Sequence, residues 1–343
     1  MKDYLEFLKS VSKVDLSEKD IELISLWSQN DYIDSHTIEL LSIHKVHHIF
    51  LNHLLTTTDV SRLKNHFGLA LSAQLAFLQE KYNENLCVLK KIVPELEKEN
   101  IHYCVIKGFS IIDSLYSKNS VVSRDFGDID FLIEKENVSK VNSIMERFGF
   151  IQGYITDKYT IEKASRKDIL YWRLNSHQEH KYIGKSEHSN ISPWLYNYID
   201  VNVTIFEGGK IPIPISTEEI MLHTRQKKLS NNISIICLDY TYEFFQLCYS
   251  FYKDTVYLSK KESHDNYCLI KFCDLREYVL KYRKEIDWNE FIAIVNRHKL
   301  GNQIYYTLFL VSSFYGDLDI DNIISKIEVD KQIFLPHWDE ILL

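Results

Sequence analysis

The sequence has 343 residues, which is long enough for two or three domains with a sizeable buried core. Hydrophobic residues make up 45% of the chain and only 10 Gly and 5 Pro interrupt it, so we expect an ordered protein with few long loops. The formal net charge of -8, from 48 acidic residues against 40 Lys plus Arg without a basic run, disfavours nucleic acid as a partner.

The N-terminal third is predicted to be helical. Ser17, followed three residues later by an acid and then by the apolar run 21–27, has the pattern of a helix start. From about Ser61 to Glu99, apolar residues recur at spacings of three and four, which predicts one long helix with a break near Pro94. The N-terminus lacks an apolar stretch of signal length, and no window approaches 18 apolar residues, so we expect no secretion signal and no membrane contact.

The hydrophobic period changes at Ile101, where short β-type runs begin to alternate with helix-length segments. This pattern predicts an α/β region in the middle of the chain. Strands are predicted at "HYCVI" (102–106), "DIDFLI" (128–133), "QEHKYI" (178–183), "YIDVNVTIF" (198–206) and "ISIICL" (233–238).

Beyond Asp239 the helical period returns and continues through four segments, which are "YEFFQLCYSFYKD", "CLIKFCDLREYVLKY", "DWNEFIAIVNRH" and "QIYYTLFLVSSFYG". The sequence therefore predicts an α+β fold, in which a mixed sheet with flanking helices lies between two helical regions. The predicted domains are a helical region at 1–100, an α/β core at 101–237 and a second helical region at 238–343.

The cysteines contain no CxxC pair and stand mostly in apolar contexts, which is typical of buried, reduced thiols. This usage predicts a cytoplasmic protein. The six are Cys87, Cys104, Cys237, Cys248, Cys268 and Cys273.

Two acids interrupt the apolar run at 128–133. In a strand, residues two apart point to the same face, so Asp128 and Asp130 are expected to project together. Paired carboxylates repel one another, and they suit Mg²⁺, which prefers carboxylate and phosphate oxygens. Asp200, the one acid in the predicted strand 198–206, is the best candidate for a third ligand. The alternative is a solvated strand end, because a D-x-D pair alone is common.

The residues around this pair suggest a phosphate site. Lys107 and Gly108 follow one predicted strand and open a helix, where backbone N–H groups and a lysine can hold phosphate oxygens. Arg124 stands four residues before Asp128, and Gly127 would allow a close approach of the backbone. The alternatives are an ordinary strand-end charge for Lys107 and an ion pair with Asp125 for Arg124.

Histidines give weaker signals. His177 and His180 have a spacing that suggests a metal pair, but in a strand they would face opposite sides, and His180 could instead face the acceptor of a reaction. The "HKVHH" segment at 44–48 is interpreted as a helix surface with one or two packed imidazoles. The aromatic stretch 240–257 is interpreted as helix core.

The order of these motifs resembles the DNA polymerase beta-like nucleotidyltransferase superfamily, and more narrowly a group of uncharacterised nucleotidyltransferases. The likeness consists of K-G, a helix ending at Leu115-Tyr116, then Arg124, "GDIDFLI" and a helix ending in "FGF". It extends over most of the chain, because "IHKVHHIFLNHL", "YIDVNVTIF" and "KFCDLREYVLKY" also resemble segments of that group.

This resemblance implies a polymerase beta-like core with a metal site and a nucleotide site. The implied metal and catalytic residues are Asp128, Asp130 and Asp200, and the implied nucleotide-binding residues are Lys107, Gly108, Ser110, Arg124 and Gly127. Two positions depart from the pattern. Gly108 is followed by Phe109, with Ser110 one place later than the usual serine, and Asn202 stands where relatives often have histidine.

The implied activity is transfer of a nucleoside monophosphate from a nucleoside triphosphate to a hydroxyl or similar group, with release of pyrophosphate. The expected cofactor is Mg²⁺, with Mn²⁺ as an alternative, and ATP is the expected nucleotide because of its abundance. The expected acceptor is a small molecule or a peptide. Two alternatives stay open, namely a non-catalytic nucleotide-binding module with the same fold and a toxin-like enzyme that modifies RNA.

Overall fold

The computed structural model describes residues 4–28, 34–57, 66–118, 121–187, 196–207, 213–256 and 267–330, together with 338 and 342. Within it the chain forms two compact units. The first unit comprises residues 1–79, 114–125 and 247–343, and the second comprises 80–113 and 126–246. Three helices continue along the chain from one unit into the other, namely α5 (His66–Lys98), α6 (Lys107–Leu115) and α10 (Tyr240–Val256).

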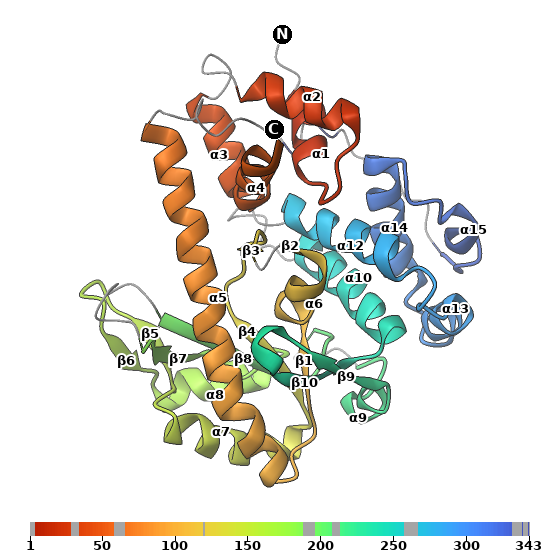
Figure 1. The fold of residues 1–343 in the computed structure, drawn as a ribbon. Helices are drawn as coiled ribbons and strands as arrows, with labels where there is room; N and C mark the ends of the chain where they lie inside the picture. The colour runs from red at the N-terminus through yellow and green to blue at the C-terminus, as the bar shows by residue number, and fades with distance from the viewer. Residues whose placement is uncertain are drawn as a thin grey trace. The chain divides into compact units, whose positions relative to one another are not determined.

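The second unit is built on an eight-stranded mixed sheet in the order β6-β5-β7-β8-β4-β1-β10-β9 (Figure 1). Its two parallel pairs are β4 with β8 and β1 with β10, and the other neighbours are antiparallel. The strands are β1 (Tyr103–Ile106), β4 (Ile129–Ile133), β5 (Ile151–Ile155), β6 (Ile161–Lys163), β7 (Tyr182–Lys185), β8 (Tyr196–Asn202), β9 (Thr224–Lys228) and β10 (Ser234–Leu238). The predicted α+β class and the mixed sheet are therefore confirmed.

The central strands are buried on both faces because nearly all their residues are apolar. Every residue of β1 and β4 is buried, whereas the edge strand β9 alternates between exposed and half-buried positions. Lysines on an exposed edge strand discourage pairing with other chains. The sheet thus has a protected centre, and any charged side chain there needs a compensating partner.

Helices α7 (Val138–Arg147), α8 (Arg166–Asn175) and α9 (Thr217–Met221) complete the second unit (Figure 1). Helix α7 buries Val141, Ile144 and Met145 on one face, as its hydrophobic spacing predicts. An ion pair of 3.0 Å between Arg147 and Glu95 joins its end to the C-terminal half of α5. Helix α8, in contrast, has no fully buried residue.

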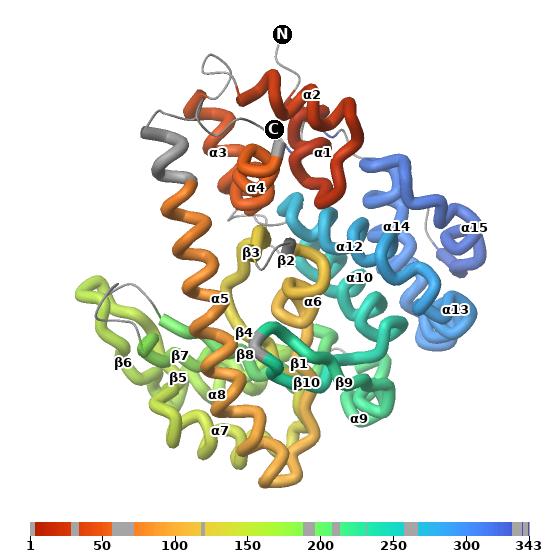
Figure 2. The backbone as a smooth tube through the Cα atoms, in the orientation of Figure 1, coloured from red at the N-terminus to blue at the C-terminus, as the bar shows by residue number. Residues whose placement is uncertain are grey.

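The first unit is mainly helical, and the helices predicted beyond Asp239 are confirmed (Figure 2). Phe7 stacks on Trp27 with 4.2 Å between ring centroids, and Phe272 packs edge-on against Phe314. The helices are α1 (Tyr4–Val11), α2 (Glu18–Trp27), α3 (Ser35–Ile43), α4 (His47–Thr57), α12 (Leu269–Tyr282), α13 (Trp288–Arg297), α14 (Gly301–Tyr315) and α15 (Asp321–Ile324). A two-stranded ribbon of β2 (Ser117–Lys118) and β3 (Val121–Val122) belongs to the same unit.

Two details of the predicted elements are wrong. Helix α5 passes through Pro94 without a break, because the proline removes one hydrogen bond while Ile92 and Leu96 on either side remain buried. The predicted strand 178–183 begins only at Tyr182, and the predicted strand 198–206 ends at Asn202. The predicted start of α5 near Ser61 lies outside the described residues.

All six cysteines are free thiols, and five of them are buried. Cys87 is the exception, being exposed on α5. Within the described part of the chain, none of the helices combines the length and the hydrophobicity that a membrane crossing needs.

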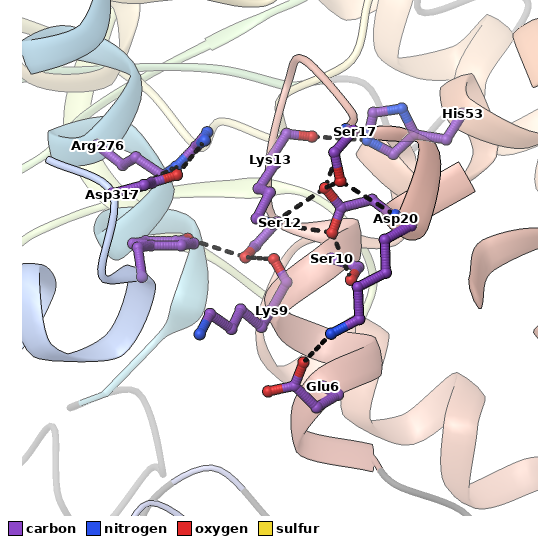
Figure 3. A network of polar contacts seen from close by, with 12 residues as sticks. Glu6, Lys9, Ser10, Ser12, Lys13, Ser17, Asp20, His53, Arg276 and Asp317 are labelled. Atoms are coloured by element: carbon purple, nitrogen blue, oxygen red, sulfur yellow. Dashed lines mark hydrogen bonds and ion pairs between the residues drawn. The ribbon is translucent and has the colours of Figure 1, made fainter. Parts of the chain in front are cut away.

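A polar network fixes the turn between α1 and α2 in the first unit (Figure 3). Asp20 accepts hydrogen bonds from the hydroxyls of Ser10 and Ser17 at 2.7 and 2.6 Å and from the Lys13 ammonium at 2.8 Å. It also completes a capping box with Ser17 at the start of α2. Burial would raise the pKa of Asp20, but these donors outweigh it and hold the pKa well below its usual range.

We therefore expect Asp20→Asn to lower the free energy of unfolding at neutral pH by about 2 kcal/mol. Because the folded pKa is depressed, the stabilisation is complete above the unfolded pKa of about 4 and is lost as the pH falls further. Urea denaturation followed by circular dichroism should show a constant gap between the proteins above about pH 5 and a narrowing gap below about pH 4.

The matched control is Glu22→Gln, which removes an exposed charge from the same helix. A loss of stability in the control equal to that of Asp20→Asn would show that helix charge alone matters, and that the network does not.

Candidate active site

Strands β4 and β8 bring two acids together at the centre of the second unit. The parallel register pairs Asp130 with Asp200 directly, so both carboxylates leave the same face of the sheet. Asp128 precedes β4 and, two residues before Asp130, is directed to that face as well. Asp130 and Asp200 are only 5% and 6% exposed, so their charges are largely withdrawn from water.

Lys107 provides the first counter-charge. It follows β1, which pairs antiparallel with β4 so that Ile106 lies opposite Asp130. Lys107 adopts a left-handed conformation with φ 58°, which is unfavourable for a residue other than glycine, and it begins α6. Its backbone N–H donates to Gln246 at 3.3 Å. Its ammonium donates to Asp130 at 2.5 Å. The unfavourable backbone conformation at Lys107 is thus accompanied by an ion pair with a buried acid.

Lys181 provides the second counter-charge. It immediately precedes β7, whose antiparallel register pairs Tyr182 with Ile199 and so sets Lys181 beside Asp200. The Lys181 ammonium donates to Asp128 at 3.1 Å and lies 3.7 Å from Asp200. It also lies 5.4 Å from the centroid of the Tyr198 ring, a distance suited to a cation–π contact.

Two amide side chains complete the arrangement. Asn202, fully buried, donates to Asp130 at 3.1 Å and accepts from Lys107 at 3.3 Å. Gln178 donates to Oδ2 of Asp200 at 3.2 Å. The other oxygen of Asp200, Oδ1, is buried and has no hydrogen-bond partner among the described residues, and it is the oxygen that lies 3.7 Å from the Lys181 ammonium. It could therefore still take a metal ion or a proton.

The three carboxyl groups differ in acidity. Burial, together with the Asp128 and Asp130 carboxylates, raises the pKa of Asp200 to about 7, although Lys181 and Lys107 act in the opposite direction. Burial likewise raises the pKa of Asp130 against the effect of Lys107. For Asp128, Lys181 and Lys107 outweigh burial and lower the pKa. One carboxyl group of the cluster thus titrates near neutral pH.

The donor set fits a divalent metal ion, since it offers three carboxylates and one unsatisfied buried oxygen. The carboxylates are not drawn tightly together, however. Among the described residues they do not form a set with one oxygen each within 4.8 Å of the others. The two ammonium groups hold the acids apart, so metal binding here requires an exchange of counter-charges.

The predicted phosphate-binding residues next to Lys107 lie in the first turn of α6. Gly108 is half-buried there, and the Ser110 hydroxyl donates to the Lys107 carbonyl at 2.8 Å. The departure at Phe109 has a structural reason, because its ring is buried between Tyr82 and Phe126. Gly127 is exposed beside Asp128, and a Cβ added there would meet no atom within 4 Å.

Arg124 lies in the first unit, where it has a firm partner. Its Nε and one terminal nitrogen donate to the two oxygens of Asp274 at 2.7 and 2.6 Å, and the other terminal nitrogen donates to the Asp125 carbonyl. Tyr116 also donates to Asp274 at 2.7 Å. The alternative of an ion pair for Arg124 is thus realised, although the acid is Asp274 and not Asp125.

Residues 34–316 match the model of a protein family that is described as "Uncharacterised nucleotidyltransferase". The chain belongs to this family. Searches of curated proteins and of solved structures found no match. The family covers both units, from α3 to the end of α14.

Several residues around the acids in this nucleotidyltransferase were not predicted from the sequence. Lys181 is the most important, because it compensates two of the three acids. A lysine within a predicted strand is a weak signal, and its role follows only from the pairing of β7 with β8. Gln178 was not predicted either, because its position beside Asp200 depends on an isolated β-bridge with Asn202.

His180 and His177, whose spacing suggested a metal pair, do not belong to a group of three or more potential metal ligands among the described residues. Its ring is buried and packs edge-on against Tyr154 and Trp172, with centroids 4.8 and 5.9 Å away. Its Nδ1 lies 3.3 Å from the Lys181 carbonyl. His180 therefore supports the backbone that presents Lys181.

The raised pKa of Asp200 leads to a prediction about stability. Because the folded pKa of about 7 lies above the unfolded value, ionised Asp200 destabilises the folded state. This penalty is absent below about pH 4, grows with pH and is complete above about pH 7. In chelator, Asp200→Asn should therefore gain stability relative to the wild type by on the order of 2 kcal/mol between about pH 5 and pH 8, measured by urea denaturation.

Asp157→Asn is the control, since Asp157 is an exposed acid of the same unit. A difference between Asp200→Asn and the wild type that stays flat across this pH range would contradict the raised pKa.

Proposed function

We propose that this nucleotidyltransferase transfers a nucleoside monophosphate from a Mg²⁺-bound nucleoside triphosphate to a hydroxyl group of a small-molecule or peptide acceptor. The observation that carries the proposal is a set of three carboxylates with two lysines as counter-charges, in which two of the acids lie on the neighbouring strands β4 and β8 and the third just before β4. ATP is the proposed donor because of its abundance, and Mn²⁺ is the proposed substitute for Mg²⁺.

Asp128, Asp130 and Asp200 would hold the metal. A bound Mg²⁺ supplies charge neutralisation for the triphosphate and for the pyrophosphate that leaves. Oδ1 of Asp200 supports its place in this set, since it is buried, makes no hydrogen bond to a described residue and is paired only at 3.7 Å with the Lys181 ammonium, so a closer cation would stabilise it. Gln178 would keep the carboxylate oriented through Oδ2.

The reaction balances without any further reactant. The acceptor oxygen forms a bond to the α-phosphorus, and the bond from that phosphorus to the oxygen bridging toward the β-phosphorus breaks. The electron pair of the broken bond leaves with pyrophosphate. The proton of the acceptor hydroxyl passes to the Asp200 carboxylate or to solvent.

Besides compensating the acids, the two lysines would bind the phosphates of the substrate. When a metal ion neutralises the acids, the ammonium groups of Lys107 and Lys181 no longer need carboxylate partners and become donors for phosphate oxygens. The first turn of α6, with Gly108 and its backbone N–H groups, offers further donors. Catalysis would then rest on positioning and charge neutralisation.

A second candidate is a nucleotide-binding module without turnover. One observation favours it. The acids already have lysine counter-charges, so the folded protein can accommodate them without ever binding metal. The two candidates differ in whether labelled nucleotide becomes attached to an acceptor when the protein is incubated with each triphosphate, Mg²⁺ and a cell extract.

The first prediction from this proposal is that triphosphate binding requires a divalent cation. Without one, ionised acids repel the phosphates. With Mg²⁺ and a triphosphate at a hundred times its dissociation constant, the free energy of unfolding should rise by about 2.7 kcal/mol, detected as a higher melting temperature. The doubly substituted Asp128→Asn, Asp130→Asn protein should fold and lose this shift, whereas Asp157→Asn should keep it.

An equal shift of melting temperature in excess chelator would refute the assignment of the acids as metal ligands. So would a doubly substituted protein that binds the metal–nucleotide complex as tightly as the wild type.

Asp200 should separate binding from chemistry. We expect Asp200→Asn to keep metal-dependent nucleotide binding within about tenfold while lowering turnover by about two orders of magnitude, because Asp128 and Asp130 still hold metal but no oxygen accepts the proton. Turnover is measured as pyrophosphate release once an acceptor is found. Near-native turnover in this variant would show that the proton leaves by another route.

A further inference from the structure

A second cluster of metal-binding side chains lies in the first unit. One nitrogen each from His47 and His48 and one carboxylate oxygen of Asp125 lie within 4.8 Å of one another. No other such group of His, Cys, Asp and Glu occurs among the described residues. The two histidines begin α4, and Asp125 follows the ribbon of β2 and β3, far along the chain.

Asp125 is held in place by its neighbours. Arg124, bound through two hydrogen bonds to Asp274 on α12, donates at 2.8 Å to the Asp125 carbonyl. The ribbon is closed by Ser123, whose N–H and hydroxyl both donate to the Tyr116 carbonyl at 3.1 Å. The backbone that carries the carboxylate is therefore fixed before any metal binds, which is a condition for a preorganised site.

The histidines are also set for metal binding. Their ring centroids lie 3.9 Å apart, so two imidazolium charges would repel strongly and neutral imidazoles, the form that binds metal, are favoured. Nδ1 of His47 is buried and has no hydrogen-bond partner among the described residues. A buried nitrogen in that state is unfavourable unless something else occupies it.

A simpler account explains part of this arrangement. A carboxylate near a helix N-terminus is stabilised by the helix dipole, so Asp125 could serve α4 without any metal. That account does not explain why two imidazoles share the same place, or why Nδ1 of His47 lacks a partner. A metal ion satisfies all three side chains at once.

We propose that His47, His48 and Asp125 bind a transition-metal ion, with Zn²⁺ the best match to two imidazoles and one carboxylate. Three protein ligands leave a fourth tetrahedral position for water. Ligands of one zinc ion lie roughly 3.4 Å apart, so modest side-chain rotations would close the observed separation. The site differs from the Mg²⁺ site in ligand chemistry, and its ligands all belong to the first unit.

The metal would join the start of α4 to the end of the segment 114–125, which enters the first unit between two segments of the second. It would fix the backbone at residue 125, three residues before Asp128 along the chain. Its role is accordingly structural, and it does not depend on whether the protein transfers nucleotides.

The test uses the full chain after treatment with chelator. Zn²⁺ is titrated in competition with a chromophoric chelator, and Co²⁺ is added separately as a spectroscopic probe. We expect about one tight equivalent of zinc and the intense visible bands of tetrahedral cobalt. Asp125→Asn and His47→Gln should each weaken zinc binding by at least about a hundredfold and remove those bands.

Two controls locate the site. The exposed His102→Gln should bind zinc as the wild type does, and the doubly substituted Asp128→Asn, Asp130→Asn protein should retain its equivalent of zinc. Zinc should raise the melting temperature of both controls and of the wild type, but not of the two ligand variants.

The proposal is overturned if the ligand variants bind zinc as tightly as the wild type, or if the wild type shows no tetrahedral cobalt spectrum. It is also overturned if Asp125→Asn lowers the melting temperature of the metal-free protein and leaves zinc uptake unchanged, since Asp125 would then act only on the helix dipole.

Discussion

Repulsion between three carboxylates, two buried and one half-buried, is the constraint that shapes the centre of the second unit. The parallel pairing of β4 with β8 places Asp130 beside Asp200, and Asp128 shares their face. Such a cluster is tolerated only with counter-charges close by, and Lys107 and Lys181 supply them. The left-handed backbone at Lys107 is a second consequence, because this conformation brings its ammonium to Asp130.

The sequence predicted the acids better than their partners. Alternation along a strand is a local property, so Asp128 and Asp130 could be assigned to one face before the strands were paired, and Asp200 could be named as the one acid of its predicted strand. Lys181 could not be assigned, because its role depends on the register of β7 against β8. Arg124 shows the same limit. Its acid, Asp274, is 150 residues away in the chain, and no local pattern identifies it.

The predicted boundaries of helices and strands were wrong where tertiary packing outweighs the local conformational preference of the residues. Pro94 lowers helix propensity, yet buried residues on both sides keep α5 continuous. The "HKVHH" segment was interpreted as a helix surface with one or two packed imidazoles. It instead connects the end of α3 to the start of α4, and His44 and His48 are indeed buried. That interpretation missed Asp125, which joins His47 and His48 only because the segment 114–125 is part of the first unit. When metal ligands come from distant segments of the chain, the sequence contains no characteristic ligand spacing from which the site could be predicted.

The charge balance of the acid cluster explains why metal and nucleotide should bind together. With all groups ionised, three carboxylates and two ammonium groups leave one net negative charge, which opposes a triphosphate. In the proposed function, a divalent cation would reverse that sign and free both lysines for the phosphates. A metal ion alone would leave those ammonium groups buried beside it, and a triphosphate alone would meet ionised acids. The proposed metal–nucleotide complex would avoid both penalties, and the lysines would then act as counter-ions that disfavour either ligand without the other.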